Sequence, residues 1–197
     1  MKLRTVSLIL LLIFSGCASA PPTPAMSTVT PNILPRLDPS PTPSSSTLPL
    51  TCQVTDLNVS INQEAGYCFA YPIRFTEEAS GGVRGPDLDV SLAPTFATFG
   101  VEVTPAAGKS LREQAESYLG SFTNTHPATF TWTDVPVAGE TGLMVEPVPT
   151  IGAWRFVFVV HNGNLFRLSY WPVGVDVAKA DIDELTQTTL GSFAFTK

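Results

Sequence analysis

Residues 153–171 read AWRFVFVVHNGNLFRLSYW. Two runs rich in aromatic and β-branched residues flank the dipeptide Asn162-Gly163. This dipeptide is the strongest short-range signal for a two-residue hairpin turn, because both positions tolerate positive φ. The stretch therefore predicts an antiparallel hairpin, and counting outward from the turn places Trp154 opposite Trp171.

Neither face of this hairpin is polar. The two-residue period of a strand places Trp154, Phe156, Phe158, Val160, Leu165, Arg167 and Trp171 on one face, and Arg155, Val157, Val159, Phe166, Leu168 and Tyr170 on the other. A hairpin that is apolar on both sides belongs in the middle of a sheet with both faces covered. Inside such a sheet each arginine needs a carboxylate or a place near the rim, although Arg155 could instead stack on Tyr170 across the strands.

Two amphipathic helices are available to cover that sheet. The first begins with a capping box formed by Ser110 and Glu113, and its apolar stripe comprises Leu111, Ala115, Tyr118, Leu119 and Phe122. The second follows Asp176, a candidate N-cap, and places Ile182, Leu185, Thr189 and Phe193 on one face. Further strands are expected at 67–71, 88–92, 99–104, 129–135 and 142–146, with a short strand or tail at 192–196. These elements predict an α+β fold in preference to an all-β one.

The N-terminus has the three regions of an export signal. Lys2 and Arg4 precede an apolar run that is too short to be a comfortable membrane span, and Ser15-Gly16-Cys17 follows it. This order resembles a bacterial lipobox, in which the cysteine receives lipid, although Phe14 stands where leucine is more usual. The alternative is an ordinary secretory signal cut near Ala18-Ser19-Ala20. Lipid on Cys17 would tether the mature protein to a membrane without spanning it, because two or three acyl chains give lasting attachment.

The predicted domain organisation has three parts. Residues 1–16 form the signal peptide, residues 17–50 the lipid-attachment cysteine and a linker, and residues 51–197 one globular domain. The linker contains nine of the chain's 18 prolines and is rich in Ser and Thr, a composition typical of disordered, partly extended spacers. We expect an exported protein anchored to the outer face of a bacterial membrane.

Two further cysteines fit an exported protein. With Cys17 committed to lipid, Cys52 and Cys68 form an even pair, and a disulfide between them would close a loop of about 17 residues. A metal site is the alternative, but two thiols without a nearby histidine make a poor zinc set. We therefore predict a disulfide and no metal site.

Charge argues against one class of partner. The formal net charge is -6, and no basic stripe is present, so nucleic acid is not expected to bind. No cofactor-binding motif was found. The expected partners are the membrane, through Cys17, and an unidentified protein or small ligand, and the domain is expected to be a monomer.

Spaced features of the domain are similar to those of the PsbP-like group, which includes extrinsic photosystem II proteins, Ran-binding Mog proteins and bacterial lipoproteins. The similarity covers residues 66–195 and rests on Tyr71-Pro72, the helix opening 109–113, the strand 141–145, the segment 166–170 and the ending 190–195. The resemblance implies an antiparallel sheet of about six strands flanked by helices, an α/β/α sandwich. It also implies docking on other proteins, and it supplies no active site.

A search for catalytic residues finds only weak candidates. His126 and His161 are better interpreted as surface residues than as general bases. The segment 80–85 is glycine-rich with one arginine, and a mobile loop is a better interpretation than an anion cradle. The acidic residues Asp87 and Asp89 on one strand, and Asp181, Asp183 and Glu184 on the last helix, could hold calcium but are more typical of solvated faces.

Two classes of function therefore remain open. The favoured one is a non-catalytic module that binds a protein or small ligand, and the alternative is a hydrolase or ligand-processing enzyme with a site assembled from loops. Candidate docking loops are 77–86 and 147–152. The second is preferred, with Val148 and Ile151 as the apolar residues that would contact a partner, although packing of both against a neighbouring strand is the simpler interpretation.

Overall fold

The computed structural model describes residues 49–86, 96–123, 129–150 and 152–197, which belong to the unit Ser45–Lys197. Cys17, the expected signal peptide and nearly all of the expected linker lie outside these residues. The elements in chain order are η1 (Leu50–Cys52), β1 (Leu57–Asn62), β2 (Tyr67–Pro72), β3 (Thr76–Glu77), β4 (Val83–Arg84), β5 (Thr98–Pro105), α1 (Leu111–Thr123), β6 (Thr131–Val137), β7 (Glu140–Thr150), β8 (Gly152–His161), β9 (Asn164–Val173), α2 (Asp176–Ser192) and β10 (Ala194–Phe195).

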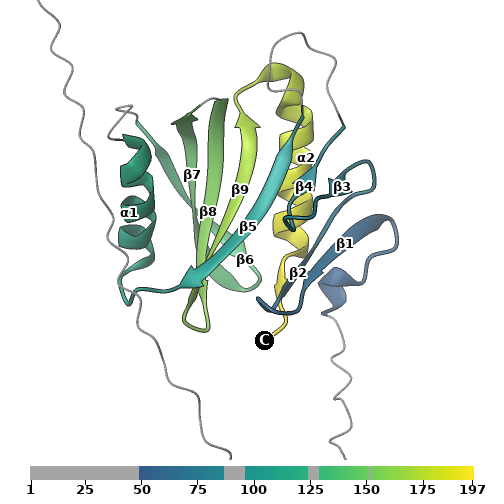
Figure 1. Cartoon of the computed structure of the whole chain (residues 1–197), viewed down its shortest axis with the longest axis horizontal. Coiled ribbons are helices and arrows are strands. Elements are labelled where there is room, and N and C mark those ends of the chain that lie inside the picture. The colour runs from purple at the N-terminus through teal and green to yellow at the C-terminus, as the bar shows by residue number, and fades with distance from the viewer. Residues whose placement is uncertain (1–48, 87–95, 124–128, 151) are drawn as a thin grey trace, which may run out of the picture. The chain divides into compact units, whose positions relative to one another are not determined.

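The predicted hairpin lies at the centre of the larger sheet. This antiparallel sheet has seven strands in the order β3-β4-β5-β9-β8-β7-β6 (Figure 1). The turn residues Asn162 and Gly163 have φ values of 46° and 76°, which explains the need for Asn-Gly. The register predicted from this turn is confirmed for every pair from His161 outward to Arg155, which lies opposite Tyr170.

Beyond Arg155 the predicted register is wrong by one residue. A bulge shifts the ladder, so that the next pair is Ala153 with Val173. Trp154 is therefore not paired with Trp171 in the ladder, although their ring centroids still lie 6.0 Å apart. A bulge adds a residue to one strand, and composition alone gives no sign of it here.

One face of the large sheet is covered by α2 and β2. Helix α2 contacts both β2 and β9, and every residue of β2 is buried. The core between these layers contains Tyr67, Phe69, Val157, Val159, Phe166, Leu168, Tyr170, Ile182, Leu185 and Phe193. The face of the hairpin assigned to Val157 and Tyr170 is thus a buried face, as predicted.

The other face of the sheet is covered in part by α1. The predicted capping box is present, because Ser110 Oγ accepts a hydrogen bond from the Glu113 amide at 3.3 Å while the Glu113 carboxylate accepts one from the Ser110 amide at 2.9 Å. The whole predicted stripe packs on the sheet, in a cluster with Leu143, Val145, Val148, Phe156 and Phe158. Helix α2 is also confirmed, but its N-cap residue is Val175 and Asp176 lies within its first turn.

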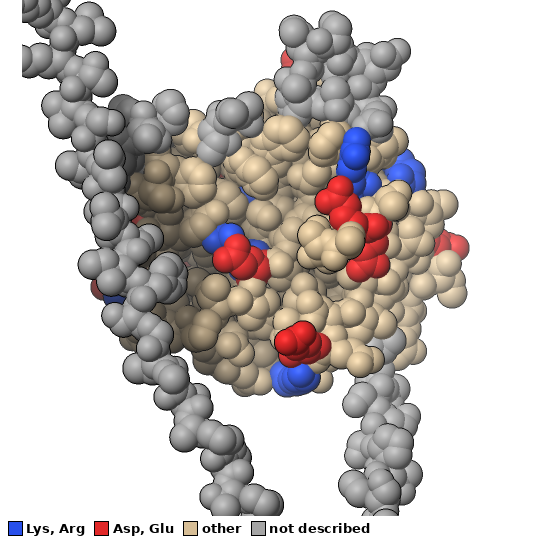
Figure 2. Space-filling model, viewed as in Figure 1, with Lys and Arg blue, Asp and Glu red and all other residues tan. Residues whose placement is uncertain are grey.

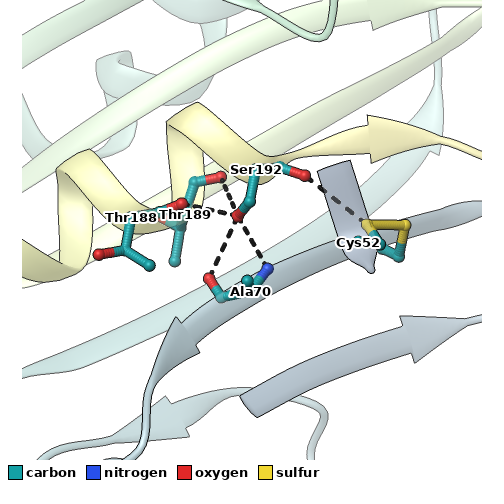
Figure 3. The surroundings of a disulfide bond; sticks show 6 residues. Cys52, Ala70, Thr188, Thr189 and Ser192 are labelled. Atoms are coloured by element: carbon teal, nitrogen blue, oxygen red, sulfur yellow. Dashed lines mark hydrogen bonds between the residues drawn. A yellow bond between two sulfur atoms is a disulfide. The ribbon is translucent and has the colours of Figure 1, made fainter. Parts of the chain in front are cut away.

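The smaller sheet, in the order β1-β2-β10, contains the disulfide. Cys52 and Cys68 are joined as predicted, with their Cα atoms 6.3 Å apart. Figure 3 shows Ser192, near the end of α2, beside this bridge: its carbonyl oxygen lies 3.6 Å from Cys52 Sγ, and its hydroxyl accepts a hydrogen bond from the Ala70 amide at 2.8 Å. The bridge, β2 and the end of α2 therefore form one buried junction.

The α+β fold class predicted from the sequence is confirmed, with seven strands in the main sheet in place of about six. The expected strand 88–92 lies outside the described residues. Within the part of the chain that the structure describes, no helix has the length and apolar character needed to cross a membrane.

Candidate functional site

Helix α1 covers only part of its face of the large sheet. It packs over β7 and β8, where Leu119 is buried against Val145 and Phe158. The neighbouring strands carry small residues on this face, because Ser169 of β9 pairs with Gly100 of β5. A hollow therefore remains beside α1, over β9.

This hollow, which we call the aromatic cleft, has a volume of about 580 Å³ and is lined by Tyr118, Phe122, Trp154, Phe156, Arg167, Ser169 and Trp171. The Trp154 ring stacks on Phe156 with centroids 5.7 Å apart, and Tyr118 makes an edge contact with Phe156 at 5.3 Å. The aromatic walls hold one another in place, as in a preformed ligand pocket.

The floor of the aromatic cleft depends on two small residues. Ser169 Oγ donates a hydrogen bond to the Gly100 carbonyl at 3.2 Å. A Cβ atom on Gly100 would lie 3.3 Å from the same Oγ, so the two residues already fit closely. A large side chain at position 169 would occupy the hollow.

Arg167 closes one end of the aromatic cleft. Its guanidinium carbon lies 3.8 Å from the centre of the Tyr118 ring, and its NH2 group forms an ion pair with Glu102. The Arg167 side chain is only 18% exposed, whereas that of Glu102 is 55% exposed. The Nε atom of Arg167 is buried and has no hydrogen-bond partner among the described residues. Such a donor has an unmet need for an acceptor.

The electrostatics at Tyr118 reflect the same contact. Burial raises the pKa of the Tyr118 hydroxyl, and the positive charge of Arg167 opposes this rise. Tyr118 therefore stays neutral at physiological pH. It offers Arg167 an uncharged aromatic face, which a cation favours.

A second, more polar hollow adjoins the first at Arg167 and Tyr118. This polar cleft has a volume of about 310 Å³, and its lining includes Glu102, Thr104, Lys109, Gln114 and Ser117. Gln114 is fixed there, because its side-chain amide donates to the Lys109 carbonyl at 2.9 Å and its side-chain oxygen accepts from the Ala107 amide at 3.2 Å. The two clefts together have an aromatic half and a polar half, with Arg167 between them.

The other arginine of the hairpin, Arg155, is held by side chains of the strand and helix that pack beside it. Arg155 Nε lies 2.5 Å from Glu146 Oε2, and its NH1 group donates to the Thr186 hydroxyl at 2.8 Å. Arg155 thus has the carboxylate partner that its burial required. Its neighbour Tyr170 hydrogen-bonds to Thr189 at 2.8 Å.

The predicted docking loop 147–152 is corrected by the structure. Val148 lies within β7 and is fully buried in the α1 core, so it cannot contact a partner. Ile151 lies outside the described residues. The other loop considered, 77–86, contains strand β4, in which Val83 is fully buried, so this part of the segment belongs to the large sheet.

The weaker candidates have ordinary surroundings. His161 lies 3.1 Å from Glu140 and stacks on Phe195. On α2, Asp181 pairs with Arg74 at 2.5 Å, and Asp183 pairs with Lys179. The face in Figure 2 is largely uncharged, and most of its red and blue groups adjoin one another.

Three of the remaining candidates, His126, Asp87 and Asp89, lie outside the described residues. Among the residues with assigned positions, no three His, Cys, Asp or Glu side chains gather where they could hold a metal ion.

The sequence interpretation missed the aromatic cleft. It placed Trp154, Phe156, Arg167 and Trp171 correctly on one hairpin face, but it assigned that whole face to the core. The available signal was Arg167 itself, since a charged side chain is rarely fully buried. The position of α1 relative to β9 could not be read from one sequence.

Comparison with known proteins adds information about the fold. No protein-family model matches the chain, and no curated protein matches it in sequence. Among solved structures, LpqN, involved in cell envelope biogenesis of Mycobacterium tuberculosis, is similar with a TM-score of 0.50 and 9% identity, over 74% of this chain and 95% of that one. Cyanobacterial PsbP from Synechocystis sp. PCC 6803 matches with a TM-score of 0.40 and 10% identity, over 72% of this chain and 94% of that one.

The chain has a PsbP-like fold. This expectation from the sequence is confirmed by the antiparallel sheet with its two helices, and the likeness to LpqN agrees with it. At 9% identity the likeness concerns the fold alone. Function must therefore be argued from the clefts.

Proposed function

We propose that this chain is an exported lipoprotein whose folded domain binds a small ligand in the aromatic cleft without transforming it. Lipid on Cys17 would hold the domain at the outer face of a bacterial membrane. The cleft offers binding chemistry, namely aromatic surface, the hydroxyl groups of Tyr118 and Ser169, and one guanidinium.

One observation carries the proposal. The cleft combines about 580 Å³ of space with five aromatic side chains and the guanidinium of Arg167. A ligand that covers the rings removes apolar surface from water. An acceptor on the same ligand can form a charge-assisted hydrogen bond with the guanidinium.

The proposed location rests on three further features. The order of basic, apolar and small residues before Cys17 is that of a lipoprotein signal. The Cys52–Cys68 disulfide suits an oxidising compartment outside the cytoplasm. LpqN, which shares the fold, is involved in cell envelope biogenesis, and an envelope role is proposed here by analogy.

The test fills the cleft without removing an aromatic residue. Ser169→Leu should occupy the hollow, whereas Ser121→Leu makes the same change at an exposed position of α1. Native mass spectrometry of protein isolated from its own membrane should detect a non-covalent ligand on the wild-type and Ser121→Leu proteins but not on Ser169→Leu. Circular dichroism and melting temperature establish that both variants fold.

Two results would contradict the proposal. One is a wild-type protein that carries no ligand, and the other is a folded Ser169→Leu protein that carries the same ligand as the wild type. A change in the ligand's mass during prolonged incubation would overturn the non-catalytic part of the proposal alone.

A further inference from the structure

We infer that the ligand of the aromatic cleft is a single acyl chain whose carboxylate or carbonyl group binds at Arg167. This inference rests on the proposed function and names its ligand class. It follows from the shape of the cleft, the polarity of its lining and the charge at its end.

The cleft is elongated between a helix and a strand. Along β9 its lining runs through Arg167, Ser169 and Trp171, which at about 3.3 Å per residue spans about 13 Å. Along α1 the lining residues Tyr118 and Phe122 are one turn apart on the same helix face. Lining residues that follow one strand and one helix turn offer successive contacts to a linear chain.

The lining has too few polar groups for a sugar. Its hydroxyl groups are those of Tyr118 and Ser169, and the second already donates to the Gly100 carbonyl. A carbohydrate in the cleft would leave most of its own hydroxyl groups without partners, at a cost for each. A methylene chain needs none and gains about 0.8 kcal/mol for each buried methylene.

The charge at Arg167 sets which end of the chain lies there. The guanidinium already occupies the face of Tyr118, so a cationic head group would be repelled from that ring. The polar cleft beyond it has two cationic side chains, Arg167 and Lys109, against the single carboxylate of Glu102. This balance favours an anionic or acceptor head group, held at the one guanidinium that both clefts share.

Two sources could supply this chemistry, a free fatty acid or a single-chain phospholipid. The probes are therefore hexanoate, octanoate and decanoate for the first source and lysophosphatidylglycerol for the second. Each is titrated below its micelle concentration into the full chain carrying Cys17→Ser, prepared without detergent to keep the cleft free. Affinity for the fatty acids should rise about fourfold for each added methylene.

The location of binding is read from tryptophan fluorescence. Two of the three tryptophans, Trp154 and Trp171, line the cleft, and the third, Trp132, lies under Arg112. In the Trp132→Phe variant, the only remaining tryptophans of the sequence are the two that line the cleft, so its tryptophan fluorescence reports on the cleft. Decanoate should change the fluorescence of this variant in proportion to the binding measured by calorimetry.

A matched pair of arginine variants tests the head-group contact. Arg112 has the same two kinds of partner as Arg167. Its guanidinium carbon lies 3.5 Å from the centre of an aromatic ring and its Nε pairs with a carboxylate, but it lies outside both clefts. Arg167→Gln should weaken decanoate binding about tenfold to a hundredfold, and Arg112→Gln should leave it unchanged. The chain-length series in the otherwise unaltered protein keeps the test decisive if Arg167→Gln fails to fold.

The outcomes separate this inference from the proposed function. Binding of either probe class with the expected chain-length and arginine dependence supports the inference and identifies the source. Affinity that does not depend on chain length, or an equal effect of the two arginine variants, overturns it. A native ligand without an acyl chain overturns it too, while leaving the aromatic cleft as a binding site.

Discussion

Tyr170 is the largest side chain buried at the centre of the domain. Thr189 Oγ1 donates to the Leu185 carbonyl at 2.7 Å, which leaves its lone pairs to accept from the Tyr170 hydroxyl at 2.8 Å. The buried hydroxyl thus has a hydrogen-bond partner. This one bond joins β9 to α2 across the core.

We expect Tyr170→Phe to lower the free energy of unfolding by about 0.5–1.5 kcal/mol, the usual value of one such bond. The change also tests a pH effect. Burial raises the pKa of Tyr170 above its ordinary value of 10.0, so its contribution to stability is present below pH 10 and is lost as the pH rises further. Urea unfolding between pH 8 and 11 should show a smaller alkaline loss for Tyr170→Phe than for the wild type. Equal alkaline losses of stability in the two proteins would show that ionisation of Tyr170 on unfolding does not contribute to the loss.

Single residues also show how far the sequence could be interpreted. The hairpin register was predictable because Asn162-Gly163 fixes the turn, and each pair follows by counting. It became wrong at Trp154, where a bulge inserts one residue. The partner of Arg155 was predictable as a carboxylate but not as Glu146, because the choice depends on how β7 bends beside β8.

Among the elements, α1 decides whether the cleft exists. It forms the helical wall through Tyr118 and Phe122, and its N-terminus is held by Ser110 and Glu113. The hydrogen bonds from Ser110 lower the pKa of Glu113. The carboxylate form is therefore part of the cap.

We expect Ser110→Ala to reduce stability by about 1 kcal/mol, the usual value of an N-cap. Ser121→Ala is the control, since the Ser121 hydroxyl donates to the Tyr118 carbonyl at 2.9 Å, in the same helix but away from its N-terminal cap. Folding lowers the pKa of Glu113 from its ordinary value of 4.5. The stability that the ionised carboxylate contributes is therefore present above pH 4.5 and is lost as the pH falls further. The difference between Ser110→Ala and wild type should thus shrink in acid, as measured by thermal unfolding at pH 3 and pH 7. A constant difference would exclude a contribution from ionised Glu113.

The helices could be predicted more fully than the outer strands. Both helices have regular apolar stripes, and α1 has an explicit capping box. Strands β3 and β4 have two residues each, too few for a period to be seen. Strand β1, with the sequence LNVSIN, alternates strictly between apolar and polar residues, so it was predictable although it was not among the expected strands. Even so, β4 contributes the buried Val83, because pairing with β5 fixes the position of this short strand in the sheet.

At the scale of the whole molecule, the disulfide joins the start of the folded domain to β2, and the end of α2 lies beside it. Cys68 lies in β2 between β1 and β10, and Cys52 lies beside the end of α2 (Figure 3). The bridge therefore restrains the segment through which the linker enters the domain. The aromatic cleft lies on the other face of the large sheet, beside α1.

Reduction of this bridge should lower the free energy of unfolding by about 3 kcal/mol, from the loop-entropy estimate for a loop of about 17 residues. The fold should survive, because the aromatic core on both sides of the sheet does not depend on the bridge. Urea titrations with and without reductant measure the effect. Cys52→Ala with Cys68→Ala provides the control, since its stability should not respond to reductant. An identical midpoint for the wild type under both conditions would contradict the prediction.

The last prediction concerns attachment. Lipid on Cys17 requires the thiol itself, whereas a secretory signal cut near residues 18–20 does not. We expect a fatty acid with an alkyne tag, supplied to growing cells, to label the wild-type protein and a Cys52→Ser variant but not Cys17→Ser. Two or three acyl chains hold a protein on a membrane through burial of their methylenes, so high salt should not release the labelled forms. Label that persists on Cys17→Ser, or its absence from the wild type, would show that export proceeds without a lipid anchor on this cysteine.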